Sequence, residues 1–332
     1  MVRIEVQTHE PANVLSTMLL ILTGAPRDAK LHPIAAHALE HTKPFVAHPS
    51  LGWLKAFYKP DDLSFLYGHV AQLAGPVSFA PRFRAVPDYV ASYEPERMKE
   101  LPAKMAAFYA NAKLGAFRRK HVPAYTLAMA DVQDALDGAR IEEFLARVYG
   151  PIKHGLVVVP VPTDLRVGGG TGAMTEWEAF AFLHPPRIPV ESADPIAWSL
   201  DPDRTQVLTQ YELSLALLYE ATRKRKDLVP RLRPILSQIP PDAPFVRTYR
   251  DPDSQFAELF VRGSSVSYLR RTRGDEAALR WMEDQIRRLG VPLVRDFFLT
   301  IEEYLQGRRW SNLDTFLEDL PNAQSLTRAI AG

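Results

Sequence analysis

The segment 155-GLVVVPVP-162, followed by 176-EWEAFAFL-183, decides the fold class of this chain. The first segment is rich in β-branched valine and the second alternates in part, so both are predicted to be strands. Pro160 has no backbone N–H to donate, which favours an edge strand for the first segment. A small sheet is therefore expected near the middle of the chain.

A glycine-rich run, Gly168-Gly169-Gly170-Thr171-Gly172, lies between these predicted strands. Such a run can cradle a phosphate when it opens a helix. This one lacks the Lys-Ser/Thr pair of a P-loop, and no helical pattern follows it directly. We therefore predict that the run forms the turn of a hairpin.

Helical patterns surround the sheet on both sides, and a further short strand is predicted at 2–7. The expected helices cover 12–23, 33–42, two segments within 53–73, a segment opening at Pro102 with Met105, Phe108, Tyr109, Ala112 and Phe117 on one face, 203–223, 275–289 closed by Gly290, and 294–305.

This order predicts the α+β class, mostly helical with a small mixed or antiparallel sheet, because strands and helices do not alternate as βαβ units. We predict a single domain over 1–330. Its parts are a helical N-terminal part (1–150), the small sheet and a loop (151–200), and a helical C-terminal part (201–330).

Composition narrows the function classes. The 332 residues carry a net charge of +1, so no strong global field favours nucleic acid or an anionic membrane as partner. The apolar run 14–25 is too short to span a bilayer. The chain has no cysteine, which removes disulfides, thiol nucleophiles and Cys-based zinc sites and fits a cytoplasmic protein.

The segment 207-VLTQYELSLALL-218 is the first candidate for chemistry. Set against the zinc-peptidase motif H-E-x-x-H, Glu212 occupies the position of the general base, while Tyr211 and Leu215 stand at the ligand positions. Neither a phenol nor an isobutyl group replaces a zinc-binding imidazole. Without that comparison, Glu212 is a carboxylate at the border of an apolar stripe that contains Tyr211 and Leu215.

A second stretch gives the comparison weight. Residues 256–270 (FAELFVRGSSVSYLR), a following helix and 297–321 (FFLTIEEYLQGRRWSNLDTFLEDLP) resemble a bacterial family of predicted gluzincin-like zinc metallopeptidases with a domain of unknown function. In that family a helix of the form E-x-x-x-R follows the H-E-x-x-H helix, and a segment Y-x-x-x-R-x-Y/W-x-x-x-x-x-F comes later. The matching residues here are Glu258 and Arg262 for the former, and Tyr304, Arg308, Trp310 and Phe316 for the latter.

The resemblance implies a zincin-like fold in which Glu212 stands at the general base and Glu258 at the third metal ligand. Because Tyr211 and Leu215 replace the histidines, we predict a degenerate member without metal or peptidase activity. Glu212 and Glu258 would then repel each other, and Arg262, one turn beyond Glu258, could pair with it. We predict a vestigial, charge-compensated pocket that includes Leu215.

Zincins hold their substrate as an extended strand along a sheet edge, so peptide binding can outlast catalysis. The leading hypothesis is a non-catalytic metallopeptidase homologue that binds a peptide or protein partner. Two alternatives stay open. His37-Ala38-Leu39-Glu40-His41 is an inverted zinc motif, which would make the protein an active zinc metallohydrolase with Glu40 as its base. The other is a helical structural or regulatory protein unrelated to peptidases.

Overall fold

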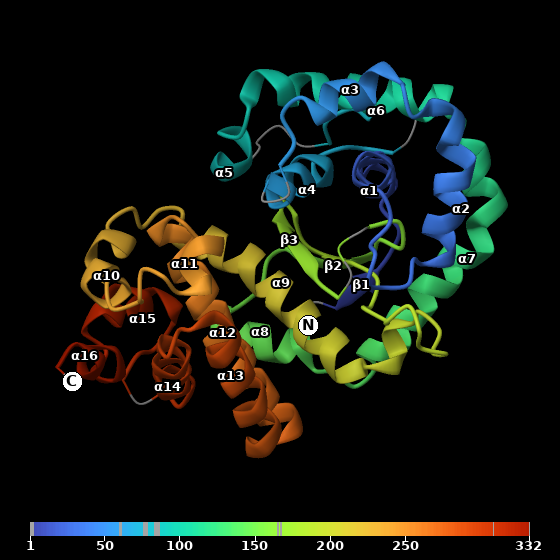
Figure 1. The fold of residues 1–332 in the computed structure, drawn as a ribbon. Coiled ribbons are helices and arrows are strands. Elements are labelled where there is room, and N and C mark those ends of the chain that lie inside the picture. The colour runs from blue at the N-terminus through green and yellow to red at the C-terminus, as the bar shows by residue number, and fades with distance from the viewer. Residues whose placement is uncertain are drawn as a thin grey trace. The chain divides into compact units, whose positions relative to one another are not determined.

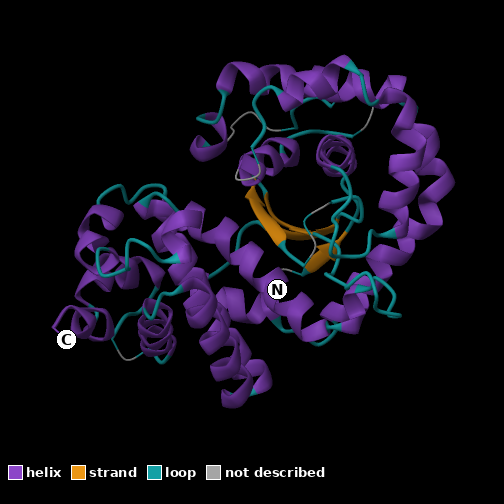
Figure 2. Ribbon diagram, viewed as in Figure 1, coloured by secondary structure: helices purple, strands orange, loops and turns teal. Residues whose placement is uncertain are grey.

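The structure is a computed structural model that describes residues 3–59, 62–75, 79–82, 87–164, 166, 168–307 and 309–331. Helices dominate and four strands form one mixed sheet (Figures 1 and 2), which confirms the predicted α+β class. Within this part of the chain, every helix is too short or too polar to cross a bilayer.

The strands are β1 (Ile4–Val6), β2 (Gly155–Pro160), β3 (Gly170–Met174) and β4 (Glu178–Leu183). The helices are α1 (Glu10–Thr23), α2 (Pro33–Thr42), α3 (Pro49–Lys55), α4 (Leu63–Ala71), α5 (Asp88–Ala91), α6 (Pro95–Asn111), α7 (Leu114–Leu136), α8 (Ile141–Tyr149), α9 (Pro202–Thr222), α10 (Leu228–Leu236), α11 (Pro244–Thr248), α12 (Pro252–Arg273), α13 (Asp275–Leu289), α14 (Leu293–Leu305), α15 (Leu313–Asp319) and α16 (Gln324–Ala331).

The strand order is β1-β2-β4-β3, with β2 parallel to both neighbours and β3 antiparallel to β4. Pro160 therefore lies on an interior strand, and the prediction of an edge strand was wrong. The sheet tolerates this proline because β1 pairs with β2 only as far as Val158, before Pro160. The next amide, Val161 N–H, donates to the Leu183 carbonyl at 2.8 Å, so the ladder to β4 stays intact.

The glycine run does not form the hairpin turn. Gly170 and Gly172 are part of β3, and the turn into β4 lies at 175–177. Thr175 closes this turn, because its N–H donates to the Glu178 carbonyl at 2.8 Å and its hydroxyl accepts from the Glu178 N–H at 3.0 Å. The turn is thus built by a hydroxyl side chain, while the glycines let other groups approach the strand closely.

The helix expected to begin at Pro102 and to include Phe117 begins and ends earlier in the structure. α6 begins at Pro95, where proline is favoured in the first turn, and it contains Pro102 in its interior. It ends at Asn111. Lys113, with a φ of 53°, precedes α7, which begins at Leu114, so Phe117 lies on that second helix. The predicted face was correct for Met105 and Phe108, which are fully buried.

The chain divides into two compact units, which are described separately. One comprises Arg3–Asp137 and His154–Glu212 and contains the sheet. Phe180 and Phe182 of β4 stack with parallel rings and pack with Val157 and Val159 of β2. The helices α1, α3, α4 and α6 cover this face of the sheet, and their apolar residues complete the core.

The other unit comprises Gly138–Lys153 and Leu213–Gly332 and is helical. α12 is its central helix and packs against α10, α13 and α14. Gly263 lies where α12 meets α14: a Cβ at this position would stand 2.8 Å from Phe298 N and 2.9 Å from Phe297 C. α13 has the predicted bounds, and Gly290 caps it with a φ of 71°. The prediction of one domain over 1–330 stays a prediction.

Candidate functional site

Glu212 lies near the middle of α9, with 5 % of its surface exposed. Its side chain lies beside β3. A Cβ built at Gly170 would stand 2.8 Å from Glu212 Cγ and 3.0 Å from its Oε1. The absence of a side chain at Gly170 therefore makes the space that the Glu212 carboxylate occupies next to this edge strand.

The stripe predicted for α9 is only partly buried. Tyr211 and Leu215, which stand at the positions of the metal ligands, are only half-buried. The polar residues Thr209 and Gln210 are fully buried. α9 thus buries polar as well as apolar residues, and Glu212 lies among them. A catalytic role for Glu212 and Tyr211 stays a prediction.

Glu258 and Arg262 form the expected pair, one turn apart on α12. Arg262 Nη2 donates to Glu258 Oε2 at 2.7 Å and to the Tyr249 hydroxyl at 3.0 Å, while Nη1 donates to Gln285 Oε1 at 2.8 Å. Burial, and then the Glu258 charge, raise the pKa of the Tyr249 phenol above its usual range. The Glu258 charge is thus compensated inside its own unit.

The vestigial pocket itself stays a prediction. Glu212 is the last residue of the sheet-containing unit, whereas Leu215, Glu258 and Arg262 belong to the helical unit. The Glu258–Arg262 pair has a structural explanation that does not require such a pocket, because a buried carboxylate needs a nearby cation.

The inverted motif lies on α2, and the chain itself engages its side chains. His41 Nε2 hydrogen-bonds to the Ala112 carbonyl at 2.8 Å, and the exposed Glu40 pairs with Lys43. His37 is exposed. In the described residues, no group of three or more His, Cys, Asp or Glu side chains is arranged to hold a metal ion. The zinc-dependent alternative stays a prediction.

The later matching residues lie together in the helical unit. Tyr304 and Phe316 stack with centroids 4.4 Å apart, and Trp310 packs on Phe316 at 5.0 Å. The Tyr304 hydroxyl donates to the Val148 carbonyl at 3.0 Å. Arg308 lies outside the described residues. This segment therefore acts in packing, joining α14 and α15 to α8.

A buried polar network that the sequence analysis did not identify lies where β2 and β4 end. Asp164 follows β2, His184 follows β4, and Tyr67 of α4 donates its hydroxyl hydrogen to Asp164 Oδ2. Arg166 Nη2 donates to His184 Nε2 at 3.0 Å and also to the Thr171 hydroxyl. The carboxyl ends of adjacent parallel strands are a common position for functional side chains.

Arg166 fixes the tautomer of His184. A guanidinium can only donate, so Nε2 is the acceptor and the ring proton is on Nδ1. Burial lowers the pKa of His184 to about 3, which keeps the ring neutral. The Thr171 hydroxyl and Asp164 Oδ2 lie 3.3 and 3.6 Å from the same Nε2. Both therefore lie on one side of the ring, which does not give a Thr-His-Asp relay.

The glycine run places β3 between this imidazole and Glu212. Consecutive residues of a strand face opposite sides of a sheet. A Cβ at Gly169 would stand 3.4 Å from His184 Nδ1, whereas one at Gly170 would stand 2.8 Å from Glu212 Cγ. The start of β3 thus has a neutral N–H donor on one face and a carboxylate on the other.

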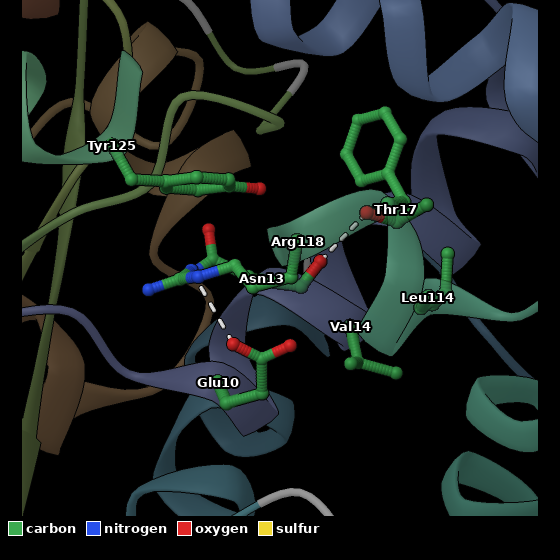
Figure 3. Close-up of a pocket in the computed structure, with 8 residues that line it drawn as sticks. Glu10, Asn13, Val14, Thr17, Leu114, Arg118 and Tyr125 are labelled. Carbon is green, nitrogen blue, oxygen red and sulfur yellow. Dashed lines mark hydrogen bonds and ion pairs between the residues drawn. The ribbon is translucent and has the colours of Figure 1, made fainter. Parts of the chain in front are cut away.

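A shallow pocket lies between α1 and α7 (Figure 3). The Arg118 guanidinium stacks on the Tyr125 ring, 3.9 Å from its centroid, and Nη1 lies 3.3 Å from Glu10 Oε2. Burial raises the pKa of the Glu10 carboxyl, although Arg118 opposes this shift. The pocket is lined by Glu10, Asn13, Val14, Thr17, Leu114, Phe117, Arg118 and Tyr125.

We expect Glu10→Gln to raise the free energy of unfolding at pH 7.5. Because the folded-state pKa is raised, stability is lost as the pH rises through it, so the cost of ionising the buried carboxyl is fully present at pH 7.5. Arg118→Met should instead lower stability, because it removes a positive charge that opposes this shift. Urea denaturation of both variants tests this, and a Glu10→Gln protein less stable than the native one would contradict it.

No protein-family model matches this chain, and neither a curated protein nor a solved structure matches it significantly.

Proposed function

We propose that this protein binds an extended peptide along the free edge of β3, as a non-catalytic homologue of zincin-like metallopeptidases. The observation that carries the proposal is the edge strand β3, in which Gly170 and Gly172 are half-buried and Gly170 lies against the Glu212 carboxylate. In zincin-like frames, a substrate strand pairs with the sheet edge next to the metal helix, and here the helix has Tyr211 and Leu215 in place of both histidines.

The hydrogen bonds between β3 and β4 show which backbone groups of β3 point away from β4. At the two ends of β3, the His184 N–H donates to the Gly169 carbonyl at 3.0 Å and the Thr175 N–H donates to the Glu178 carbonyl at 2.8 Å. In an antiparallel pair these bonds involve alternate residues. Gly170 and Gly172 therefore point their N–H and C=O groups away from β4.

This edge is accessible at one end and covered at the other. Gly170 and Gly172 are half-buried, whereas Ala173 and Met174 are buried. The Met174 carbonyl accepts a hydrogen bond from Gln72 Nε2 at 2.9 Å. A peptide strand would consequently pair with the glycine end, where no side chain on β3 obstructs its backbone.

We expect Gly172→Pro to weaken peptide binding at least about tenfold, the effect of losing one or two backbone hydrogen bonds. The substitution removes an N–H that points to the open edge and leaves the bonds to β4 in place. Decapeptides selected from a random displayed library on the native protein would be measured by fluorescence polarisation against both proteins.

Two controls accompany this experiment. The circular dichroism and urea midpoint of Gly172→Pro should match those of the native protein. Methylation of alternate peptide amides should abolish binding in one register only, since a paired strand uses every second N–H. Equal affinity of both proteins, or a library without binders, would contradict the proposal.

A further inference from the structure

Three histidine side chains gather where α2 packs on α7. His37 and His41 lie one turn apart on α2, and His121 lies on α7 with its ring centroid 5.1 Å from that of His37. The Phe117 ring lies against the other two imidazoles, with centroids 4.4 Å from His121 and 5.1 Å from His41. The tertiary fold thus adds a histidine that no sequence motif connects with the pair on α2.

The packing of the two helices fixes the positions from which these rings project. Ala38 of α2 is buried together with Phe117 and Tyr125 of α7. At the border of this small core, His37 is exposed and His121 is half-buried. The backbone beneath the two rings is therefore held in place, while each ring can turn about its Cβ–Cγ bond.

The rings of His37 and His121 are available to a ligand. In the described part of the chain, the contacts of these two rings are with other rings. Desolvation, and then the charges of His37 and Lys120, lower the pKa of the His121 imidazole, which favours the neutral form that binds metals. His41 differs, because its Nε2 is already hydrogen-bonded to the Ala112 carbonyl at 2.8 Å.

The separation of the two rings suits a shared metal ion. Imidazole nitrogens bind Zn²⁺ at about 2.0–2.1 Å, and two rings bound at a tetrahedral angle have centroids about 5 Å apart. The centroids of His37 and His121 are separated by 5.1 Å. Two nitrogen ligands favour the borderline ions Zn²⁺, Ni²⁺ and Cu²⁺ over Mg²⁺ and Ca²⁺, which prefer oxygen.

We propose that His37 and His121 together bind one divalent transition-metal ion of this borderline class, which links α2 to α7. Water completes the coordination, because in the described residues no third His, Asp or Glu is arranged to join the two rings. The site differs from the inverted motif, which pairs His37 with His41 and uses Glu40 as a base. It is independent of the peptide-binding function.

The charged neighbours leave room for a cation. Lys120 acts on the His121 ring but is exposed, so that water and salt screen its charge. Glu40, one turn beyond His37, pairs with Lys43. An ion at the two imidazoles therefore meets a single screened positive charge from a lysine.

Titration of the tag-free, full-length protein with NiCl₂ at pH 7.5, followed by calorimetry, tests the proposal. The native protein should bind one Ni²⁺ per chain, and MgCl₂ should give no binding. His37→Ala and His121→Ala should each weaken Ni²⁺ binding at least about tenfold, because a single imidazole cannot chelate the ion. Circular dichroism should show that both variants are folded.

His41→Gln is the matched control. It removes the neighbouring histidine of α2, keeps a side chain that can donate to the Ala112 carbonyl, and should leave Ni²⁺ affinity unchanged. Binding that is lost in His41→Gln and kept in His121→Ala would assign the ion to α2 alone and overturn the proposal. Equal affinity of His121→Ala and the native protein would likewise mean an adventitious ion only.

A second measurement tests whether the ion links the two helices. An ion that binds the folded pair of imidazoles more tightly than the unfolded chain should raise the urea midpoint of the native protein. The midpoint of His121→Ala should rise less. A native midpoint that saturating Ni²⁺ leaves unchanged would overturn the link. Gly172→Pro should bind Ni²⁺ as the native protein does, so this proposal and the peptide-binding function fail separately.

Discussion

Acidification from pH 7 to pH 5 is expected to remove most of the stability of the fold. His9, His32 and His184 are buried, and burial lowers their pKa values from 6.5 to about 3, 4 and 3. Each uses a ring nitrogen as an acceptor: His9 for the Ala12 N–H, His32 for the Ile34 N–H, and His184 for Arg166. Protonation at those nitrogens would break these bonds.

The direction of this change in folding stability follows from proton linkage. Below pH 6.5 the unfolded chain binds protons at these histidines and the folded chain does not, so stability falls as the pH falls. Each histidine contributes about 1.4 kcal/mol per pH unit, and together they contribute about 4 kcal/mol per pH unit. A total stability of about 5–15 kcal/mol is typical of a folded protein.

Urea denaturation at intervals between pH 7.5 and pH 5 measures this loss. The double variant His9→Asn and His32→Asn is the matched control, because asparagine can cap both helices without titrating. It should lose roughly half as much stability as the native protein over this range, because His184 and His69, whose pKa burial also lowers to about 4, still contribute. A native protein equally stable at both pH values would show that the histidines are protonated in the folded state.

Replacement of Gly263 by alanine is expected to destabilise the helical unit by about 3 kcal/mol, at the upper end of the usual cost of overpacking. The added Cβ would meet the α14 backbone, with Phe298 N at 2.8 Å and Phe297 C at 2.9 Å. Backbone atoms within a helix cannot turn aside as a side chain can. α12 and α14 would have to separate, and the contacts that Phe297 makes in the core would loosen.

Thermal and urea unfolding of Gly263→Ala test this expectation. Gly52→Ala serves as the control, because this glycine lies within a helix with free space around its Cα. That variant should be unchanged or more stable by about 0.5–1 kcal/mol, owing to the higher helix propensity of alanine. A similar stability of the two variants would mean that α12 and α14 are not closely packed.

The parts of the fold that depend on local sequence were predictable. Ala278, Met282 and Leu289 mark one face of α13, and Gly290 caps its end, so its bounds follow from neighbouring residues alone. The same holds for the Glu258–Arg262 pair, since residues four apart on a helix are adjacent whatever the rest of the fold does.

The parts of the fold that depend on pairing between distant segments could not be predicted from the sequence. The valines of β2 fit an edge or an interior strand equally well, and only its pairing with β1 and β4 places Pro160 inside the sheet. The same pairing brings Asp164 next to His184. Aspartate and histidine directly after two predicted strands were a visible signal, but their meaning depends on a parallel register that the sequence pattern does not specify.

The helical unit begins with a segment, Gly138–Lys153, that the ribosome makes long before the rest of that unit, Leu213–Gly332. α8 lies in this early segment, and its buried residues, including Phe144 and Val148, have partners such as Tyr268 and Tyr304. At about 5–20 residues per second, translation takes on the order of 10 s to supply them. A nascent chain therefore exposes the apolar face of α8 without these partners for that time.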